Sequence, residues 1–176
     1  MAPLVSVVMT HYNQPEPFLR ECLQSLLAQT LPEWEGIVVD DGSSRGDAEG
    51  VLRDLHDPRF TFIRHEKNRG LGAARNTGIQ AARASMIALL DADDRFSPEF
   101  LKTTLHALHD HPEAHWVAVD WQVFGARDWI WPFPVHLSMN CPAHFLFAGA
   151  GMLMRKSVWE MTSGYSEDET MRGGED

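Results

Sequence analysis

The stretch SMIALLDADD, residues 85–94, joins an apolar segment to three aspartates. Residues 85–90 are apolar enough to form a strand buried on both faces, as strands of parallel sheets are. The alanine-rich segment 70–84 before it predicts a helix whose small side chains let it approach a sheet closely. After the aspartates, Ser97 as cap and Pro98 as first residue predict the start of another helix. The stretch therefore predicts a helix, a buried strand that ends on carboxylates, and a second helix.

The same alternation of strands and helices continues on both sides of this stretch. β-Branched and apolar residues predict further strands at 4–10, 36–40, 60–64 and 116–124. Apolar residues at helical spacing predict one helix that ends near Gln29 and another that ends before Pro58, with residues 41–44 placed to cap the second. Such alternation with short connections is typical of an α/β fold, a mostly parallel open sheet with helices on both faces. Because no repeat or linker divides the chain, we expect one domain over residues 1–176.

The charge of the chain excludes one broad class of function. Lys and Arg number 15 against 25 Asp and Glu, which gives a formal net charge of −10. Such a surface repels phosphate backbones, so we expect no nucleic-acid partner. The N-terminus lacks the pattern of a signal peptide, and no apolar run reaches the roughly 20 residues that span a bilayer. Two cysteines outside any metal-ligand spacing suit a reducing compartment, so we expect a cytoplasmic location without a membrane span in this chain.

Three polar clusters are expected to meet at one edge of the sheet. They follow the first, second and fourth predicted strands and comprise residues 11–13, 40–44 and 91–94. Because ligands of open α/β sheets bind beyond the carboxyl ends of the strands, this edge is where we expect the chemistry of the protein.

The aspartates at 91, 93 and 94 suit a divalent cation. Carboxylates this close repel one another unless a cation compensates them. Mg²⁺ or Mn²⁺ would do so while keeping coordination positions for diphosphate oxygens. The alternative is a solvated acidic turn before the helix that begins at Ser97.

Two other features leave a choice between binding and structure. Asp40 or Asp41 can accept the imide N–H of uracil or thymine, or a ribose hydroxyl, unless both only cap the next helix. The loop from Gly70 to Arg75 resembles a dinucleotide-binding glycine loop, but Arg75 replaces its third glycine and the loop follows the third strand, which excludes an NAD site. Arg75 can instead pair with a diphosphate or with one of the aspartates.

The last residues of the chain and a group of aromatic residues leave similar alternatives. A carboxylate in the segment Gly173–Asp176 can act as a general base at a cleft, or belong to a frayed acidic terminus. Trp129, Trp131 and Phe133 can form a platform for an acceptor sugar, or pack in the core.

Five motifs, taken together, resemble those of family 2 glycosyltransferases, which are inverting enzymes with the Rossmann-like GT-A fold. The resemblance covers residues 4–176, and the motifs stand in the family's order and spacing: VSVVMTHYNQPEPFLRECLQSLLAQT, VVDDGSS, NRGLGAARNTGI, LLDADD and AGAGMLMRKSVWEMTSGYSED. The resemblance implies a nucleotide-binding half at about 1–95 and an acceptor-side half at about 96–176. Because family members continue beyond the ED motif at 175–176, it also implies that the C-terminal part of the second half is missing.

The resemblance assigns a role to each matching polar residue. Nucleotide-binding roles fall on Thr10, Tyr12, Asp41, Arg75 and Asp91. Metal-binding roles fall on Asp93 and Asp91 of the DxD motif, and the donor-sugar role falls on Asp94. Catalytic roles fall on Glu175 and Asp176 of the ED motif, with Asp176 as the general base.

The implied function is transfer of a hexosyl group from a nucleotide diphosphate sugar, with UDP as the favoured nucleotide, to a hydroxyl acceptor with inversion. The acceptor would be a saccharide, a lipid-linked compound or another alcohol, the cofactor Mg²⁺ or Mn²⁺, and the process polysaccharide biosynthesis, in the cytoplasm or at the inner face of the membrane. The missing C-terminal part leaves a nucleotide-sugar-binding fragment without transferase activity as one alternative. A DxD phosphatase of the haloacid dehalogenase type is another, although that type carries Thr or Val where this chain has Arg95.

Overall fold

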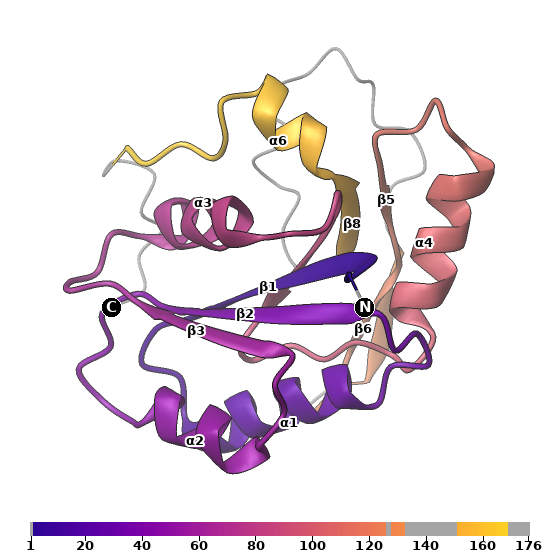
Figure 1. Cartoon of the computed structure of the whole chain (residues 1–176). Helices are drawn as coiled ribbons and strands as arrows, with labels where there is room; N and C mark the ends of the chain where they lie inside the picture. Colours follow the sequence, from indigo (N-terminus) through magenta and orange to yellow (C-terminus); the bar gives the residue numbers. More distant parts are fainter. Residues whose placement is uncertain (1, 126–127, 133–150, 169–176) are drawn as a thin grey trace.

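A six-stranded sheet organises the chain, of which the structure, a computed structural model, describes residues 2–125, 128–132 and 151–168. The strands lie in the order β3-β2-β1-β4-β8-β5 (Figure 1). Their bounds are Val5–His11 for β1, Trp34–Asp40 for β2, Phe60–Arg64 for β3, Met86–Asp91 for β4, Trp116–Ala118 for β5 and Met152–Arg155 for β8. β1 to β4 run parallel, and β8 runs antiparallel to β4 and β5. The expected α/β fold with a mostly parallel open sheet is confirmed.

Helices cover both faces of this sheet (Figure 1). One face carries α1 (Glu16–Leu27), α2 (Ala48–Leu55) and α4 (Phe100–Asp110), whose apolar side chains share one core cluster. The other face carries α3 (Leu71–Ala81) and α6 (Lys156–Met161), which contribute to a second cluster. Among the described residues, every helix falls short of the length and apolar character that crossing a bilayer requires.

β1 shows why an apolar sequence gives a central strand here. All seven of its residues are buried. Because successive side chains of a strand point to opposite faces, Val7 and Met9 pack in the core shared with α1, while Val8 packs in the core shared with α3. A strand placed between two layers of helices cannot alternate apolar and polar residues, and this one does not.

The segment expected to form one strand over 116–124 forms two strands in different sheets. β5 stops at Ala118, and β6 (Trp121–Val123) pairs with β7 (Trp129–Trp131) in a separate antiparallel hairpin. The reason lies in the partner of β5. Ala118 pairs with Met152, the first residue of β8, so the sheet offers no strand partner beyond this point and the chain turns away.

The helices also begin differently from the sequence expectation. α4 begins at Phe100 rather than at Pro98, and Ser97 is not its cap. Instead, the side chain of Gln29 accepts a hydrogen bond from the Leu101 amide at 3.0 Å, so a residue distant in sequence satisfies the start of this helix. α2 is capped by Asp47, which accepts from the Gly50 amide at 2.8 Å, and not by residues 41–44.

Gly78 lets α3 approach the sheet and yields a stability prediction. A Cβ at this position would overlap Cγ1 of Val8 and would lie 3.3 Å from Cγ2 of Val39. Ala in place of Gly normally stabilises a helix interior by about 1 kcal/mol, but overpacking a core costs about 1–3 kcal/mol. We therefore expect Gly78→Ala to lower the free energy of unfolding by up to about 2 kcal/mol in denaturant titrations. Gln80→Ala, an exposed change on the same helix, should not lower the free energy of unfolding. A Gly78→Ala variant that is more stable than the original chain would show that α3 can move away from the sheet at no cost in free energy.

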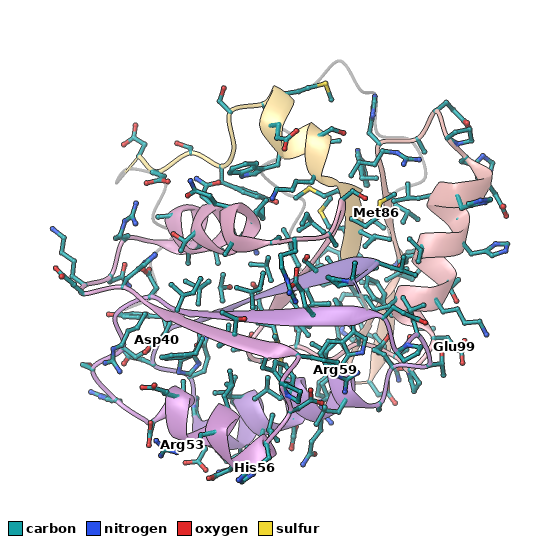
Figure 2. All side chains as sticks on the ribbon, viewed as in Figure 1. Asp40, Arg53, His56, Arg59, Met86 and Glu99 are labelled. Atoms are coloured by element: carbon teal, nitrogen blue, oxygen red, sulfur yellow. The ribbon has the colours of Figure 1, made fainter. Side chains whose placement is uncertain are left out.

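The register of the parallel strands brings their carboxyl ends together. His11 pairs with Asp40, and Thr10 pairs with Asp91, so β1 lies between the two acidic strand ends. Figure 2 shows Asp40 at one end of the sheet and Met86, the first residue of β4, at the other. The expected convergence of polar segments on one edge is confirmed.

Candidate functional site

Thr10, Arg75 and Asp91 form a polar cluster at the carboxyl edge of the sheet, in which Thr10 and Arg75 are buried and the Asp91 side chain is 29% exposed. The Thr10 hydroxyl donates to Oδ1 of Asp91 at 3.0 Å, and Nη2 of Arg75 donates to both carboxylate oxygens at 3.2 and 3.3 Å. Arg75 is only 5% exposed, so its charge depends on this carboxylate. Among the described residues, Nε of Arg75 has no hydrogen-bond partner, so the guanidinium keeps one unused donor. The pairing of Arg75 with an aspartate, one of the two sequence-based alternatives, is therefore observed.

Tyr165 completes this cluster from the far end of the chain. Its ring centroid lies 5.5 Å from the guanidinium carbon of Arg75. Burial raises the pKa of Tyr165 to about 12, so the phenol stays neutral and adds no charge near Asp91. The cluster thus carries one positive and one negative side chain, with an aromatic ring against the guanidinium.

The acidic loop after β4 separates its carboxylates into different environments. The Asp94 amide donates to the Asp91 carbonyl at 2.9 Å, which closes a tight turn. Asp93 is exposed, whereas Asp94 is partly buried. Burial, together with the negative charges of Asp91 and Asp93, raises the pKa of Asp94 to about 6. Within the described ranges, no group of three or more His, Cys, Asp or Glu side chains is arranged to hold a metal.

The donor chemistry of this loop nevertheless suits Mg²⁺ or Mn²⁺. Such ions are commonly held by only one or two protein carboxylates, the remaining positions being taken by water and substrate phosphates. Asp93 presents an exposed carboxylate, and Asp91 presents one that is already oriented by Thr10 and Arg75. These oxygens fit a cation that is completed by a diphosphate, and they do not fit a closed structural site.

Asp41 lies in a second network, at the end of β2. Its Oδ1 accepts from Nδ1 of His65 at 2.6 Å and from the Arg69 amide at 2.9 Å, and its Oδ2 accepts from the Gly70 amide at 2.7 Å. The carboxylate therefore fixes the loop that leads into α3. Asp40 accepts instead from the Ser43 amide at 3.0 Å. The interpretation that these aspartates cap α2 is wrong, because both bind other loop groups.

Sequence reasoning missed two residues of this region, His65 and Asn76. His65 orients Asp41 and contacts Thr77 Oγ1 through Nε2 at 2.9 Å, but no motif marks it. Asn76 uses its whole side chain: its amide nitrogen donates to the Tyr165 carbonyl and Glu167, and its oxygen accepts from Trp159 Nε1 and the Tyr165 amide, all at 2.8–2.9 Å. The motif NRGLGAARNTGI contained this residue, next to Arg75, and was the available signal.

The remaining predicted residues divide into described and undescribed ones. Tyr12 is half-buried just after β1. Trp129 and Trp131 are 48% and 59% exposed on β7, so the interpretation that they pack in the core is wrong. Phe133, Glu175 and Asp176 lie outside the described residues.

His11 gives a prediction about pH. Burial lowers its pKa, against an opposing effect of Asp40, and its Nδ1 has no partner in the described part of the chain. An unfolded histidine takes up a proton near pH 6.5, so below that pH the unfolded state binds more protons and stability falls. We expect the Tm to fall less for His11→Asn than for the original chain between about pH 7.5 and about pH 5.5. The Tm of His106→Asn, a change at an exposed site, should fall as much as that of the original chain. An equal fall in the Tm of His11→Asn would show that burial does not act on His11.

Comparisons with known proteins agree with this architecture. The family model described as Glycosyl transferase family 2 matches residues 6–161. The uncharacterized glycosyltransferase MJ1057 of Methanocaldococcus jannaschii is 42% identical over 102 residues, which cover 57% of this chain and 35% of the relative. The chain spans about a third of the length of the curated relatives that it matches most strongly.

Solved structures show the same fold at low sequence identity. S. aureus TarS 1–349 in complex with UDP matches with a TM-score of 0.76 and 22% identity, over 99% of this chain and 52% of that one. The mannosyltransferase PcManGT from Pyrobaculum calidifontis, in complex with GDP-Man and Mn²⁺, matches with a TM-score of 0.71 and 21% identity, over 96% of this chain and 49% of that one.

Proposed function

The chain belongs to glycosyl transferase family 2, and from that premise we propose that it transfers a sugar from a UDP-sugar to a hydroxyl acceptor with inversion, assisted by a divalent metal. Its fold is the GT-A fold. The observation that carries the proposal is the cluster of Thr10, Arg75 and Asp91 beside an acidic loop, at the edge where open α/β sheets bind ligands. Membership of this family decides against the phosphatase alternative.

In this proposal the nucleotide lies across the ends of β1, β2 and β4. Thr10, Tyr12 and Asp91 line its pocket, and Arg75 stands near the base or the phosphates with the donor that it has not used. Asp41 is the proposed contact for the uracil imide; its carboxylate already accepts three hydrogen bonds, from His65 and from the Arg69 and Gly70 amides, so it would receive the base in a fixed orientation. The UDP bound by TarS supports uridine as the nucleotide.

Asp93 and Asp91 are the proposed ligands of Mg²⁺ or Mn²⁺, and Asp94 the proposed neighbour of the donor sugar. The metal, when bound, would neutralise charge that builds up on the departing diphosphate. The Mn²⁺ in PcManGT supports a divalent ion. The chain's own contribution is an orientation that exists before binding, because Thr10 and Arg75 already hold Asp91.

Asp176 is the proposed general base and Glu175 its partner in the ED motif. A carboxylate within hydrogen-bond reach of the acceptor hydroxyl would take its proton as the oxygen attacks the anomeric carbon from the face opposite the diphosphate. Attack on that face inverts the configuration. The proposed acceptor is a saccharide or a lipid-linked alcohol.

The test of this function separates binding from transfer. Calorimetric titration should show that UDP binds in the presence of Mn²⁺, and that Asp93→Asn weakens this binding about 100-fold, in line with the loss of one metal ligand. Asp110→Asn, an exposed change on α4, is the control. Asp176→Asn should bind UDP normally and lose UDP-sugar consumption.

Each result decides a different part of the proposal. Failure of UDP to bind with Mn²⁺ would exclude a nucleotide-sugar site. Normal UDP binding with equal UDP-sugar consumption by the original chain and Asp176→Asn would favour a binding fragment without transferase activity. UDP binding that does not depend on Mn²⁺ would contradict the role of Asp93 as a metal ligand.

A further inference from the structure

Resting on the proposed transferase function, we propose that a cavity of about 470 Å³ beside the acidic loop binds the acceptor as an uncharged pyranose ring and disfavours uronic acids. The cavity lies between the end of the acidic loop, the start of α4 and the segment that joins β5 to β6. Its volume falls within the range of about 300–1,000 Å³ that is typical of small-ligand sites.

The cavity and the cluster of Thr10, Arg75 and Asp91 lie on opposite sides of the acidic loop. Leu90, Phe96 and Phe100, which line the cavity, belong to the core that the sheet shares with α1 and α4. Arg75 belongs to α3, on the other face. Asp94 lines the cavity, while Asp91, at the start of the same turn, binds Arg75. A molecule in the cavity would therefore contact the acidic loop at Asp94, the proposed neighbour of the donor sugar, rather than at the pair of Asp91 and Arg75.

Trp121 forms an aromatic wall that is suited to a sugar ring. The residue is 41% exposed and lines the cavity. Its Nε1 lies 2.7 Å from the position that a Cβ would take at Gly151, which has a φ of +83°, so the indole rests against bare backbone. A rigid, half-exposed ring offers a flat apolar surface to the C–H face of a pyranose without losing side-chain freedom on binding.

Phe124 and Arg95 fix a second wall. The guanidinium carbon of Arg95 lies 4.2 Å from the centroid of Phe124, and its Nη2 lies 2.9 Å from Oε2 of Glu21 on α1. Both residues line the cavity. The contacts on two sides hold Arg95 in place, so this wall also exists before a ligand arrives.

The polar groups of the lining select an uncharged ligand. Asp94 supplies carboxylate oxygens that can accept hydrogen bonds from sugar hydroxyls. Arg95, the one guanidinium among the described lining residues, already pairs with Glu21. A uronic acid would bring a further negative charge to a surface that already carries the Asp94 carboxylate, and like charges at short range oppose binding.

The experiment follows the indole N–H resonance of Trp121 by NMR, on the full chain saturated with UDP and Mn²⁺. Trp121→Phe assigns the resonance. Methyl glycosides of glucose, galactose and mannose are titrated alongside the corresponding methyl uronides. At least one neutral glycoside should shift the resonance to saturation, and its uronide should bind about tenfold more weakly or less. The buried indole of Trp34 should not respond.

Two variants of matched exposure provide the control. Phe124→Ala should weaken glycoside binding about tenfold, as loss of an interface aromatic does. Phe18→Ala, on α1, removes a ring that is 49% exposed against 48% for Phe124, and should leave glycoside binding unchanged. An unchanged UDP affinity shows that each variant is folded.

Each contrary result has a distinct meaning. The inference is overturned if UDP binds and no glycoside shifts Trp121, if a uronide binds as tightly as its neutral counterpart, or if Phe124→Ala binds like Phe18→Ala. It is also overturned if UDP itself shifts Trp121 to saturation, because the cavity would then hold the nucleotide. Failure of UDP to bind at all would instead contradict the proposed function.

Discussion

Arg75→Met is expected to lower the free energy of unfolding by about 2 kcal/mol, because it leaves the partly buried Asp91 without its charged partner. Arg75 is almost fully buried and donates to both oxygens of that carboxylate, while methionine supplies a similar volume and no donor. UDP affinity should fall at least about tenfold in the same variant, since the carboxylate loses its fixed orientation. Denaturant titration and calorimetry measure the two effects.

The control for this prediction is an arginine of the same chain in a different environment. Arg53→Met removes an exposed guanidinium on α2 (Figure 2) and should change stability by less than about 0.5 kcal/mol. The double variant Arg75→Met with Asp91→Asn should lose less than the sum of the single losses, because the unpaired charge has gone. Additive losses would show that the two side chains do not stabilise each other.

Asp41→Ala is expected to have an effect of similar size, through a loop rather than an ion pair. The change removes the acceptor of His65 Nδ1 and of the Arg69 amide, and leaves the Gly70 amide with Asn68 Oδ1 alone; a buried donor without an acceptor costs about 1–3 kcal/mol. We expect a total loss of about 3 kcal/mol and much faster hydrogen exchange at the Arg69 and Gly70 amides. Asp41→Asn, which keeps one acceptor oxygen, should have a free energy of unfolding between those of Asp41→Ala and the original chain.

A carboxylate on the surface provides the comparison for Asp41. Asp54→Ala breaks only a long contact of 3.4 Å with Arg20, in which both side chains are largely exposed, so it should cost less than about 1 kcal/mol. Unchanged protection of the Arg69 and Gly70 amides in Asp41→Ala would contradict the structural role, and would leave the nucleotide as the reason for this aspartate.

The sequence predicts the parallel part of the sheet, β1 to β4, because its signals are local. The mostly apolar start of β1, Val5 to Met9, favours a strand between two layers, and the rule for parallel sheets then brings Thr10 and Asp91 to the same edge. Whether Arg75 would bind an aspartate or a phosphate could not be decided in this way. That choice depends on how closely α3 approaches the sheet, which Gly78 helps to set through its contacts with Val8 of β1 and Val39 of β2.

Other parts of the structure depend on contacts between distant segments, and there the sequence pattern misleads. The run WVAVDWQVF reads as one strand, but the strand ends where its partner β8 begins, at Met152. At the start of α4, the side chain of Gln29 rather than that of Ser97 accepts a hydrogen bond from a backbone amide. Asn76 donates a hydrogen bond to the carbonyl of Tyr165, which lies 89 residues further along the chain. Each of these contacts joins residues that no local window contains.

The position of β8 also sets an order of events during synthesis. β8 lies between β4 and β5, although both precede it in the chain. β1 to β4 can pair as they leave the ribosome, because each new strand finds a neighbour that has already emerged. β5 must wait, since its partner in the main sheet is β8. We therefore expect β5 of a nascent chain to lack its partner until Arg155 has cleared the exit tunnel, and the chain to depend most on chaperones during that interval.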